Sequence, residues 1–152
     1  MNIEKIIAAI DAGCFHSEEK VKNYGEVFTP WWLINQMCDA FPKDDYSNPT
    51  TTFLDPCTGR GNMPAVIVQR LMVGLKEFCP DESERYRHIM EKQIYMGELQ
   101  RENAMAIDRI FNPDKTLQLN LYVGDFLKMP KDFFDLPFRE RIKKYPRNYV
   151  WW

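Results

Sequence analysis

The sequence predicts an α/β domain with three to four parallel strands, flanking helices and an N-terminal helical extension. Short apolar runs that have the character of strands alternate with helical segments, and this alternation is typical of a parallel sheet with right-handed crossovers. The first three runs each lead into an acidic residue, namely Asp55, Glu98 and Asp125. Because ligands in such folds bind beyond the carboxyl ends of the strands, these acids mark a candidate site.

Composition narrows the classes of function. The 152 residues are 45% hydrophobic and 28% charged, which is typical of one globular domain. The net charge of −2 provides no overall positive field for nucleic acid. The cysteines form no C-x-x-C pair or zinc signature, so we expect no metal site and reduced thiols in a cytoplasmic protein. No apolar run approaches the ~20 residues of a membrane span, so we expect no membrane contact.

Two helices are predicted in the N-terminal region, residues 1–41. The isoleucines at 3, 6, 7 and 10 follow the i, i+3, i+4, i+7 spacing of an amphipathic helix, which Gly13 would end. A second helix is expected over about 30–41, because Thr29 suits the N-cap and Pro30 the first helical position. Breakers and polar residues over 42–51 then indicate a surface loop.

Strands and helices alternate through the central region, residues 52–128. Strands are predicted at 52–54, 93–97 and 117–123. Helical spacing follows Gly61, and another helix is expected over 103–111. Asp81 and Glu84 suit a capping box for a short charged helix between the first two strands.

The C-terminal tail, residues 129–152, is basic and aromatic. We expect one helix around 137–145 and a possible fourth strand at 149–152. Aromatic residues at the end of the tail are able to stack on bases. They follow a cluster of basic residues, which consists of Arg139, Arg141, Lys143, Lys144 and Arg147. This cluster is either a contact for DNA or, as is more usual for a basic helix, a solvated face or a surface for a protein partner.

The stretch FLDPCTGRGN, residues 53–62, joins the first strand to a helix. Its glycines, Gly59 and Gly61, allow a ligand to approach the backbone closely. Glu98, at the end of the second strand, suits hydrogen bonds to ribose hydroxyls. Glycine turns and strand-end acids also occur without any ligand. Glu98 moreover follows the glycines by ~40 residues instead of the ~20 of the dinucleotide fingerprint, which weakens a pyrophosphate interpretation.

Four segments in order resemble one enzyme family: GEVFTPWWLINQM, FLDPCTGRGN, IYMGEL and LYVGDFL. They are similar to the cofactor half of S-adenosylmethionine-dependent DNA adenine-N6 methyltransferases that carry an F-T-P segment ahead of the glycine loop. The resemblance covers about residues 24–127. It implies a partial Rossmann-like methyltransferase fold with sheet order 3-2-1 and possibly 4, S-adenosyl-L-methionine as cofactor, and DNA methylation of the restriction–modification type.

The resemblance also implies a set of cofactor-binding residues: Phe28, Thr29, Pro30, Asp55, Pro56, Gly59, Gly61, Glu98, Asp125 and Phe126. The F-T-P residues would flank the methionine moiety, and the loop after the first strand would line its amino-acid end. Glu98 would bind the ribose, while Asp125 and Phe126 would contact the adenine. Cys57 and Arg60 stand where the family more often has small residues.

The catalytic motif of that family is absent from this sequence. Family members bind the target amine with an Asn, Asp or Ser followed by Pro-Pro and an aromatic residue, and they extrude the base from the duplex. The nearest match, residues 135–138, lacks the first proline and follows no apolar strand. We therefore expect a chain truncated before this motif, with unknown catalytic residues. An exposed sheet edge would favour a homo-oligomer or a completing protein partner.

A second hypothesis remains open. The chain is then a catalytically inactive, methyltransferase-like module of phage or mobile-element origin that binds the cofactor or a protein partner.

Overall fold

A three-stranded parallel sheet lies at the centre of the computed structural model, which describes residues 3–12 and 29–150. The strands are β1 (Phe53–Asp55), β2 (Ile94–Glu98) and β3 (Asn120–Val123), in the order β1-β2-β3. This confirms the predicted α/β class and the adjacency of the three strands. Parallel pairing places the carboxyl ends of β1, β2 and β3 at one edge of the sheet, where the loops that follow them meet.

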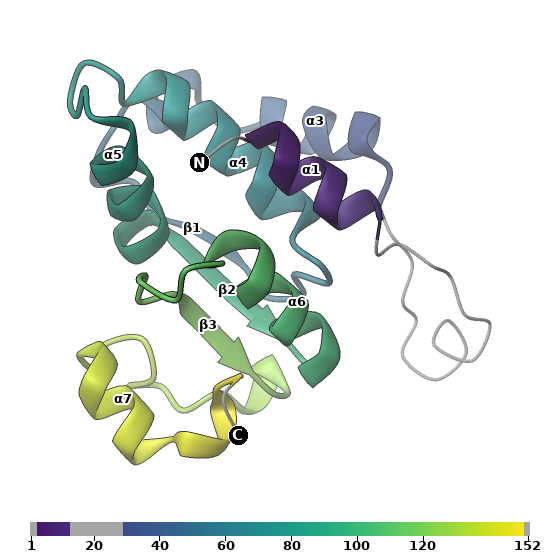
Figure 1. Cartoon of the computed structure of the whole chain (residues 1–152), viewed down its shortest axis with the longest axis vertical. Helices are drawn as coiled ribbons and strands as arrows, with labels where there is room; N and C mark the ends of the chain where they lie inside the picture. The colour runs from purple at the N-terminus through teal and green to yellow at the C-terminus, as the bar shows by residue number, and fades with distance from the viewer. Residues whose placement is uncertain (1–2, 13–28, 151–152) are drawn as a thin grey trace.

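One face of the sheet is covered by a layer of helices. The layer consists of α1 (Ile3–Asp11), α3 (Trp31–Asp39), α4 (Asn62–Gly74), α5 (Glu82–His88) and α6 (Arg101–Phe111). Figure 1 shows α1, α3 and α4 grouped together, with the sheet below them. Alternate strand residues point into this layer, among them the fully buried Met96 and the nearly buried Leu121, and they share one apolar core with the helices.

The opposite face is covered only in part. A second cluster of aromatic residues packs there under α7 (Phe138–Lys144), which lies beyond β3 in Figure 1. Phe133 is its centre, with ring centroids 4.9 Å from Tyr122 and 5.7 Å from Tyr149. Phe134 reaches Tyr95 of β2 at 5.1 Å. Leu54 of β1, however, is 52% exposed, because this cover stops before β1.

Most predicted elements are present with shifted boundaries. Asp81 caps α5 as predicted, since its side chain accepts a hydrogen bond of 2.8 Å from the N–H of Glu84. A π-helix over Ile89–Gln93 then leads into β2. The cap predicted for α3 was wrong: Pro30 occupies the N-cap position, and no side chain caps this helix. Gly13, expected to end the first helix, lies outside the described residues.

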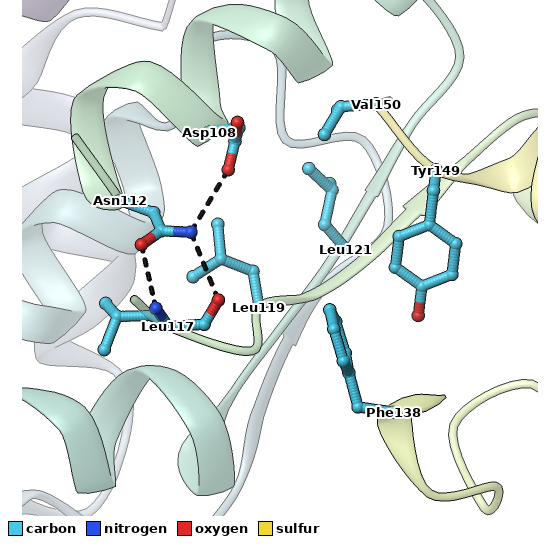
Figure 2. A pocket seen from close by; sticks show the side chains of 8 residues that line it. All are labelled: Asp108, Asn112, Leu117, Leu119, Leu121, Phe138, Tyr149 and Val150. Atoms are coloured by element: carbon cyan, nitrogen blue, oxygen red, sulfur yellow. Dashed lines mark hydrogen bonds between the residues drawn. The ribbon is translucent and has the colours of Figure 1, made fainter. Parts of the chain in front are cut away.

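The third strand begins three residues later than predicted because a side chain holds the preceding segment. Asn112, at the end of α6, accepts a hydrogen bond of 2.9 Å from the N–H of Leu117 and donates one of 3.1 Å to its carbonyl. Figure 2 shows this clamp, together with the bond from Asn112 to Asp108. The N–H of Gln118 is also held, by a hydrogen bond of 2.9 Å to the Glu91 carboxylate. The backbone of Leu117 and the Gln118 N–H are therefore unavailable for strand pairing, and β3 starts at Asn120.

The possible fourth strand is not formed by the residues that the structure describes. Tyr149 and Val150 lie in a bend and a turn. They also lie beside β3, since Nδ2 of Asn148 donates a hydrogen bond of 2.9 Å to the carbonyl of Val123. The Tyr149 ring, 3% exposed, is held by its stacking on Phe133, which explains why this stretch does not pair with β1. Trp151 and Trp152 lie outside the described residues.

Candidate cofactor-binding site

The loop after β1 is fastened both to its own strand and to β2. The Thr58 hydroxyl donates a hydrogen bond of 2.8 Å to the carbonyl of Asp55. The Thr58 N–H donates one of 2.9 Å to the carbonyl of Gly97. The loop therefore has a set position over the carboxyl end of the sheet, although it contains two glycines.

The two glycines have different tasks. Both have positive φ, +58° at Gly59 and +99° at Gly61, a region that other residues enter only with strain. A Cβ at position 61 would lie 2.5 Å from Cε2 of the buried Phe111, so Gly61 lets α4 and α6 approach closely. A Cβ at position 59 would meet nothing within 4 Å. Gly59 therefore borders open space, as a ligand-facing residue would.

Glu98 joins the loops at this edge of the sheet. Its carboxylate is almost fully buried, with the residue 5% exposed. One oxygen accepts a hydrogen bond of 2.8 Å from Gly59 N–H, and the other accepts one of 2.6 Å from Gln100 N–H. The carbonyl of Glu98 accepts a further bond of 2.9 Å from Gly124 N–H. Glu98 thus holds the site in shape, in addition to any contact that it makes with a ligand.

A cavity of about 230 Å³ opens between α3 and this loop. Its lining mixes apolar side chains, backbone and two charged groups: Thr29, Ile34, Met37, Asp55, Cys57, Thr58, Gly59, Arg60, Asn62 and Met63. Three residues of the predicted cofactor set are brought together here, namely Thr29, Asp55 and Gly59.

Asp55 supplies the negative charge of the cavity. Burial raises the pKa of its carboxyl group, and a hydrogen bond of 3.1 Å from the N–H of Cys57 opposes that rise. No cationic side chain pairs with Asp55 within the described residues. A partly buried carboxylate without a cation is electrostatically suited to a positively charged ligand group.

The loop after β3 contributes the second flank of the site. The Asp125 carboxylate accepts a hydrogen bond of 3.1 Å from Leu127 N–H, and it lies 3.1 Å from Nζ of Lys128. The ring of Phe126 lies against Gly97, where a Cβ would be 2.4 Å from the ring and 2.8 Å from the carbonyl of Pro56. Pro56 and Phe126 therefore flank Gly97, outside the cavity lining.

Of the remaining predicted residues, Pro30 is exposed at the start of α3 and does not line the cavity. Phe28 lies outside the described residues. Sequence reasoning gave no ligand role to Ile34 or Met37, two cavity residues that are spaced i, i+3 on α3. Arg60 was noted only as a departure from the family pattern. Its position next to Gly59 in the sequence does not determine whether the Arg60 side chain lines the cavity.

The 135–138 tetrapeptide lies at the other end of the sheet. The carbonyl of Leu136 accepts a hydrogen bond of 3.2 Å from Arg141, which also donates one of 3.2 Å to the side chain of Asn120. Asn120 begins β3, whereas Asp55 ends β1. The tetrapeptide is therefore separated from the candidate cofactor site by the length of the strands.

The basic cluster is not a continuous exposed surface. Arg141 is only 4% exposed and is bound to Asn120 and to carbonyls before α7, so its prediction as a DNA contact was wrong. Lys144 lies 2.5 Å from the Asp132 carboxylate, while Arg139, Lys143 and Arg147 are exposed. Of the tail aromatics that the structure describes, Tyr149 is buried and so is not available to stack on bases, and the hydroxyl of Tyr145 donates a hydrogen bond of 2.6 Å to Asp132.

The described residues contain neither a membrane-spanning helix nor a cluster of metal-binding side chains. None of the helices in 3–12 and 29–150 combines the length and apolar character needed to cross a membrane. In the same part of the chain, no three His, Cys, Asp or Glu side chains are grouped closely enough to hold a metal ion.

Comparison with known proteins gives one informative similarity. No family model matches the sequence. The chain is 37% identical over 87 residues to a protein of Mycoplasma pneumoniae described as an uncharacterized adenine-specific methylase. The match covers 55% of this chain and 21% of that protein, so the chain spans about one fifth of the relative's length. This partial similarity supports a relationship to methyltransferases, and the parallel α/β sheet is compatible with it.

Proposed function

We propose that this chain is the S-adenosylmethionine-binding portion of a DNA adenine-N6 methyltransferase. One observation carries the proposal: the loops that follow the three parallel strands meet at one edge of the sheet. Asp55, which pairs with no cation among the described residues, lines a cavity there, and Glu98 accepts a hydrogen bond from Gly59. The description of the Mycoplasma pneumoniae relative as an adenine-specific methylase supports methyl transfer as the reaction class. That name says nothing of the cofactor, which is part of the proposal.

The charge and lining of the cavity fit this cofactor. S-Adenosylmethionine carries a sulfonium and an ammonium group and no phosphate, and when bound it supplies an electrophilic methyl group. Asp55 would hold the ammonium group, which would relieve the unfavourable burial that raises the pKa of this residue. Ile34, Met37 and Met63 would contact the methylene chain. A phosphate ligand would instead face an uncompensated carboxylate.

Methyl transfer would require residues that this sequence does not contain. The proline motif is absent, and the 135–138 tetrapeptide lies at the wrong end of the sheet. We propose that a further segment or a second polypeptide supplies the motif and packs beside β1, where Leu54 is exposed. DNA contact through the exposed Arg139, Lys143 and Arg147 is part of the same proposal.

Calorimetric titration with S-adenosylhomocysteine tests the cofactor proposal. Wild-type protein should bind it, and Asp55→Asn should weaken binding by about tenfold or more, because a charge-assisted contact becomes neutral. Asp114→Asn, which removes an exposed carboxylate outside the cavity, is the control and should bind as the wild type does. No binding by the wild type, or equal binding by Asp55→Asn, would contradict the proposal.

Methyl transfer is measured separately, with labelled S-adenosylmethionine and adenine-containing DNA. The chain alone should give background counts, and a polypeptide bearing the proline motif should restore transfer. Cofactor binding with background counts for every such polypeptide would instead support a binding module without catalytic activity.

A further inference from the structure

We infer that Arg60 binds the carboxylate of the cofactor's amino-acid end and makes the cavity selective for a zwitterionic group. The inference rests on the proposed function and adds a specificity residue to it. Arg60 lies between the two glycines of the loop and lines the same cavity as Asp55.

The first observation is that the Arg60 guanidinium has no partner among the residues that the structure describes. Its Nε atom is buried, and none of the residues that the structure describes accepts a hydrogen bond from it or pairs with its charge. Arg85 also has an unpaired Nε, but its Nη1 donates a hydrogen bond of 2.6 Å to the carbonyl of Cys79. A buried N–H without an acceptor is costly and rare, so the position of Arg60 points to an acceptor supplied by a ligand.

The second observation is that Asp55 and Arg60 do not neutralise each other. They line one cavity, yet no ion pair joins them, and the pKa of Asp55 is raised by burial without an opposing effect of Arg60. Two hydrogen bonds hold the loop between them in place. The Thr58 hydroxyl donates one to the carbonyl of Asp55, and the Gly59 N–H donates the other to the carboxylate of Glu98. The cavity therefore presents one negative and one positive group that are kept apart.

A zwitterion matches both charges. An α-amino acid group carries an ammonium, suited to Asp55, and a carboxylate, which a guanidinium binds with two parallel hydrogen bonds. A ligand with only a negative group is repelled by Asp55, and one with only a positive group leaves Arg60 unpaired. The cavity should therefore discriminate between S-adenosylhomocysteine and its decarboxylated analogue, in which hydrogen replaces the carboxylate.

The test compares these two ligands by calorimetry on wild-type protein and on Arg60→Gln. Wild type should bind S-adenosylhomocysteine about 10- to 100-fold more tightly than the decarboxylated analogue, the range for a hydrogen bond to a charged group. Arg60→Gln should lose most of that preference by weakening S-adenosylhomocysteine alone. Arg60→Lys should recover part of it, since lysine keeps the charge but not the planar fork.

A matched control removes a positive charge elsewhere. Arg109 is exposed on α6 and lines no cavity described above, so Arg109→Gln should keep the wild-type preference. Thermal unfolding separates a binding role from a structural one: Arg60→Gln should be at least as stable as the wild type, because it removes an unsatisfied buried group. A clear loss of stability would contradict the inference.

The outcomes distinguish this inference from the proposed function. If wild type binds both ligands and Arg60→Gln keeps their affinity ratio, Arg60 is not the carboxylate site, while the proposed function stands. If wild type has equal affinity for both ligands, the zwitterion selectivity is overturned. If wild type binds neither, the proposed function and the inference both fail.

Discussion

Asp55 lies in an environment that disfavours its charged form. Burial raises the pKa of its carboxyl group above that of an aspartate in the unfolded chain, while the Cys57 N–H compensates only in part. Folded protein then binds more protons than unfolded protein between these two pKa values. The free energy of unfolding contributed by this group is therefore greatest below about pH 3.9, the unfolded value, and falls as pH rises through the folded pKa.

Asp55→Asn should remove this pH dependence. The amide does not titrate, and its oxygen still accepts the hydrogen bond from Cys57. We expect a higher free energy of unfolding than in wild type at pH 7, and a smaller fall between acidic and neutral pH. Urea unfolding across this range measures both quantities, and parallel curves for the two proteins would show that Asp55 is not destabilising.

Glu98 should matter for stability as well as for binding. In Glu98→Gln the side-chain amide group faces one of the two backbone N–H donors, either Gly59 or Gln100. Leaving one buried donor unsatisfied should cost about 1–3 kcal/mol in the free energy of unfolding, measured in urea. An unchanged midpoint would mean that these hydrogen bonds are not made. Because Glu98 also shapes the loop, Asp55 is the better residue for testing ligand contact.

At the scale of elements, the β1 loop depends on two glycines that should respond differently to substitution. Gly61→Ala meets both a strained φ and the buried Phe111 ring, and we expect a loss of about 2–4 kcal/mol. Gly59→Ala meets only the strain and should lose about 1 kcal/mol. Thermal or urea unfolding of the pair measures the difference, and equal losses would contradict the close approach of α6 to Gly61.

The helix α7 is held to the sheet by an inward-facing arginine. Arg141 donates hydrogen bonds to Asn120 and Leu136 and stacks on the Phe133 ring at 5.5 Å. Arg141→Gln should lower the free energy of unfolding by about 2–4 kcal/mol, because it leaves buried acceptors unpaired. The exposed Arg139 on the same helix is the control, and Arg139→Gln should stay within about 0.5 kcal/mol of wild type. Equal effects of the two substitutions would argue against a structural role for Arg141.

At the scale of the molecule, β1 is an edge of the sheet among the described residues 3–12 and 29–150. There β1 pairs with β2 alone, and its Leu54 is 52% exposed on the face opposite the helical layer. Edge strands with exposed apolar side chains favour pairing with another chain. This agrees with the proposal of a second copy or a completing partner beside β1.

Sedimentation velocity tests self-association at this edge. Wild type should show a dimer fraction that grows with protein concentration, and Leu54→Glu should reduce it, because a carboxylate would have to be desolvated at the contact. Val73→Glu changes an apolar residue on α4 that is 75% exposed and should leave association unchanged. A monomer at every concentration would exclude the homo-oligomer and leave a different partner to be sought.

Sequence alone determined the properties that depend on local spacing. The alternation of strands and helices, the acids at the strand ends and the capping of α5 by Asp81 all follow from periodicity or from contacts within a few residues. These patterns were sufficient to predict a parallel sheet with a site beyond its carboxyl edge. They did not predict the start of β3, because Asn112 and Glu91 bind the backbone of the two residues, Leu117 and Gln118, at which the strand was expected to begin.

Only the tertiary structure decided which of the predicted site residues lie in the same environment. Arg141 belongs to a basic run in sequence but turns inward, because aromatic rings and free carbonyls meet it there. Asp55 and Arg60 are close in sequence, yet only the folded loop places both at one cavity without pairing them. The physical reason is that burial and charge compensation depend on contacts between segments that are distant along the chain. The hydrogen bond between Gly59 and Glu98 is one such contact, and no local sequence pattern predicts it.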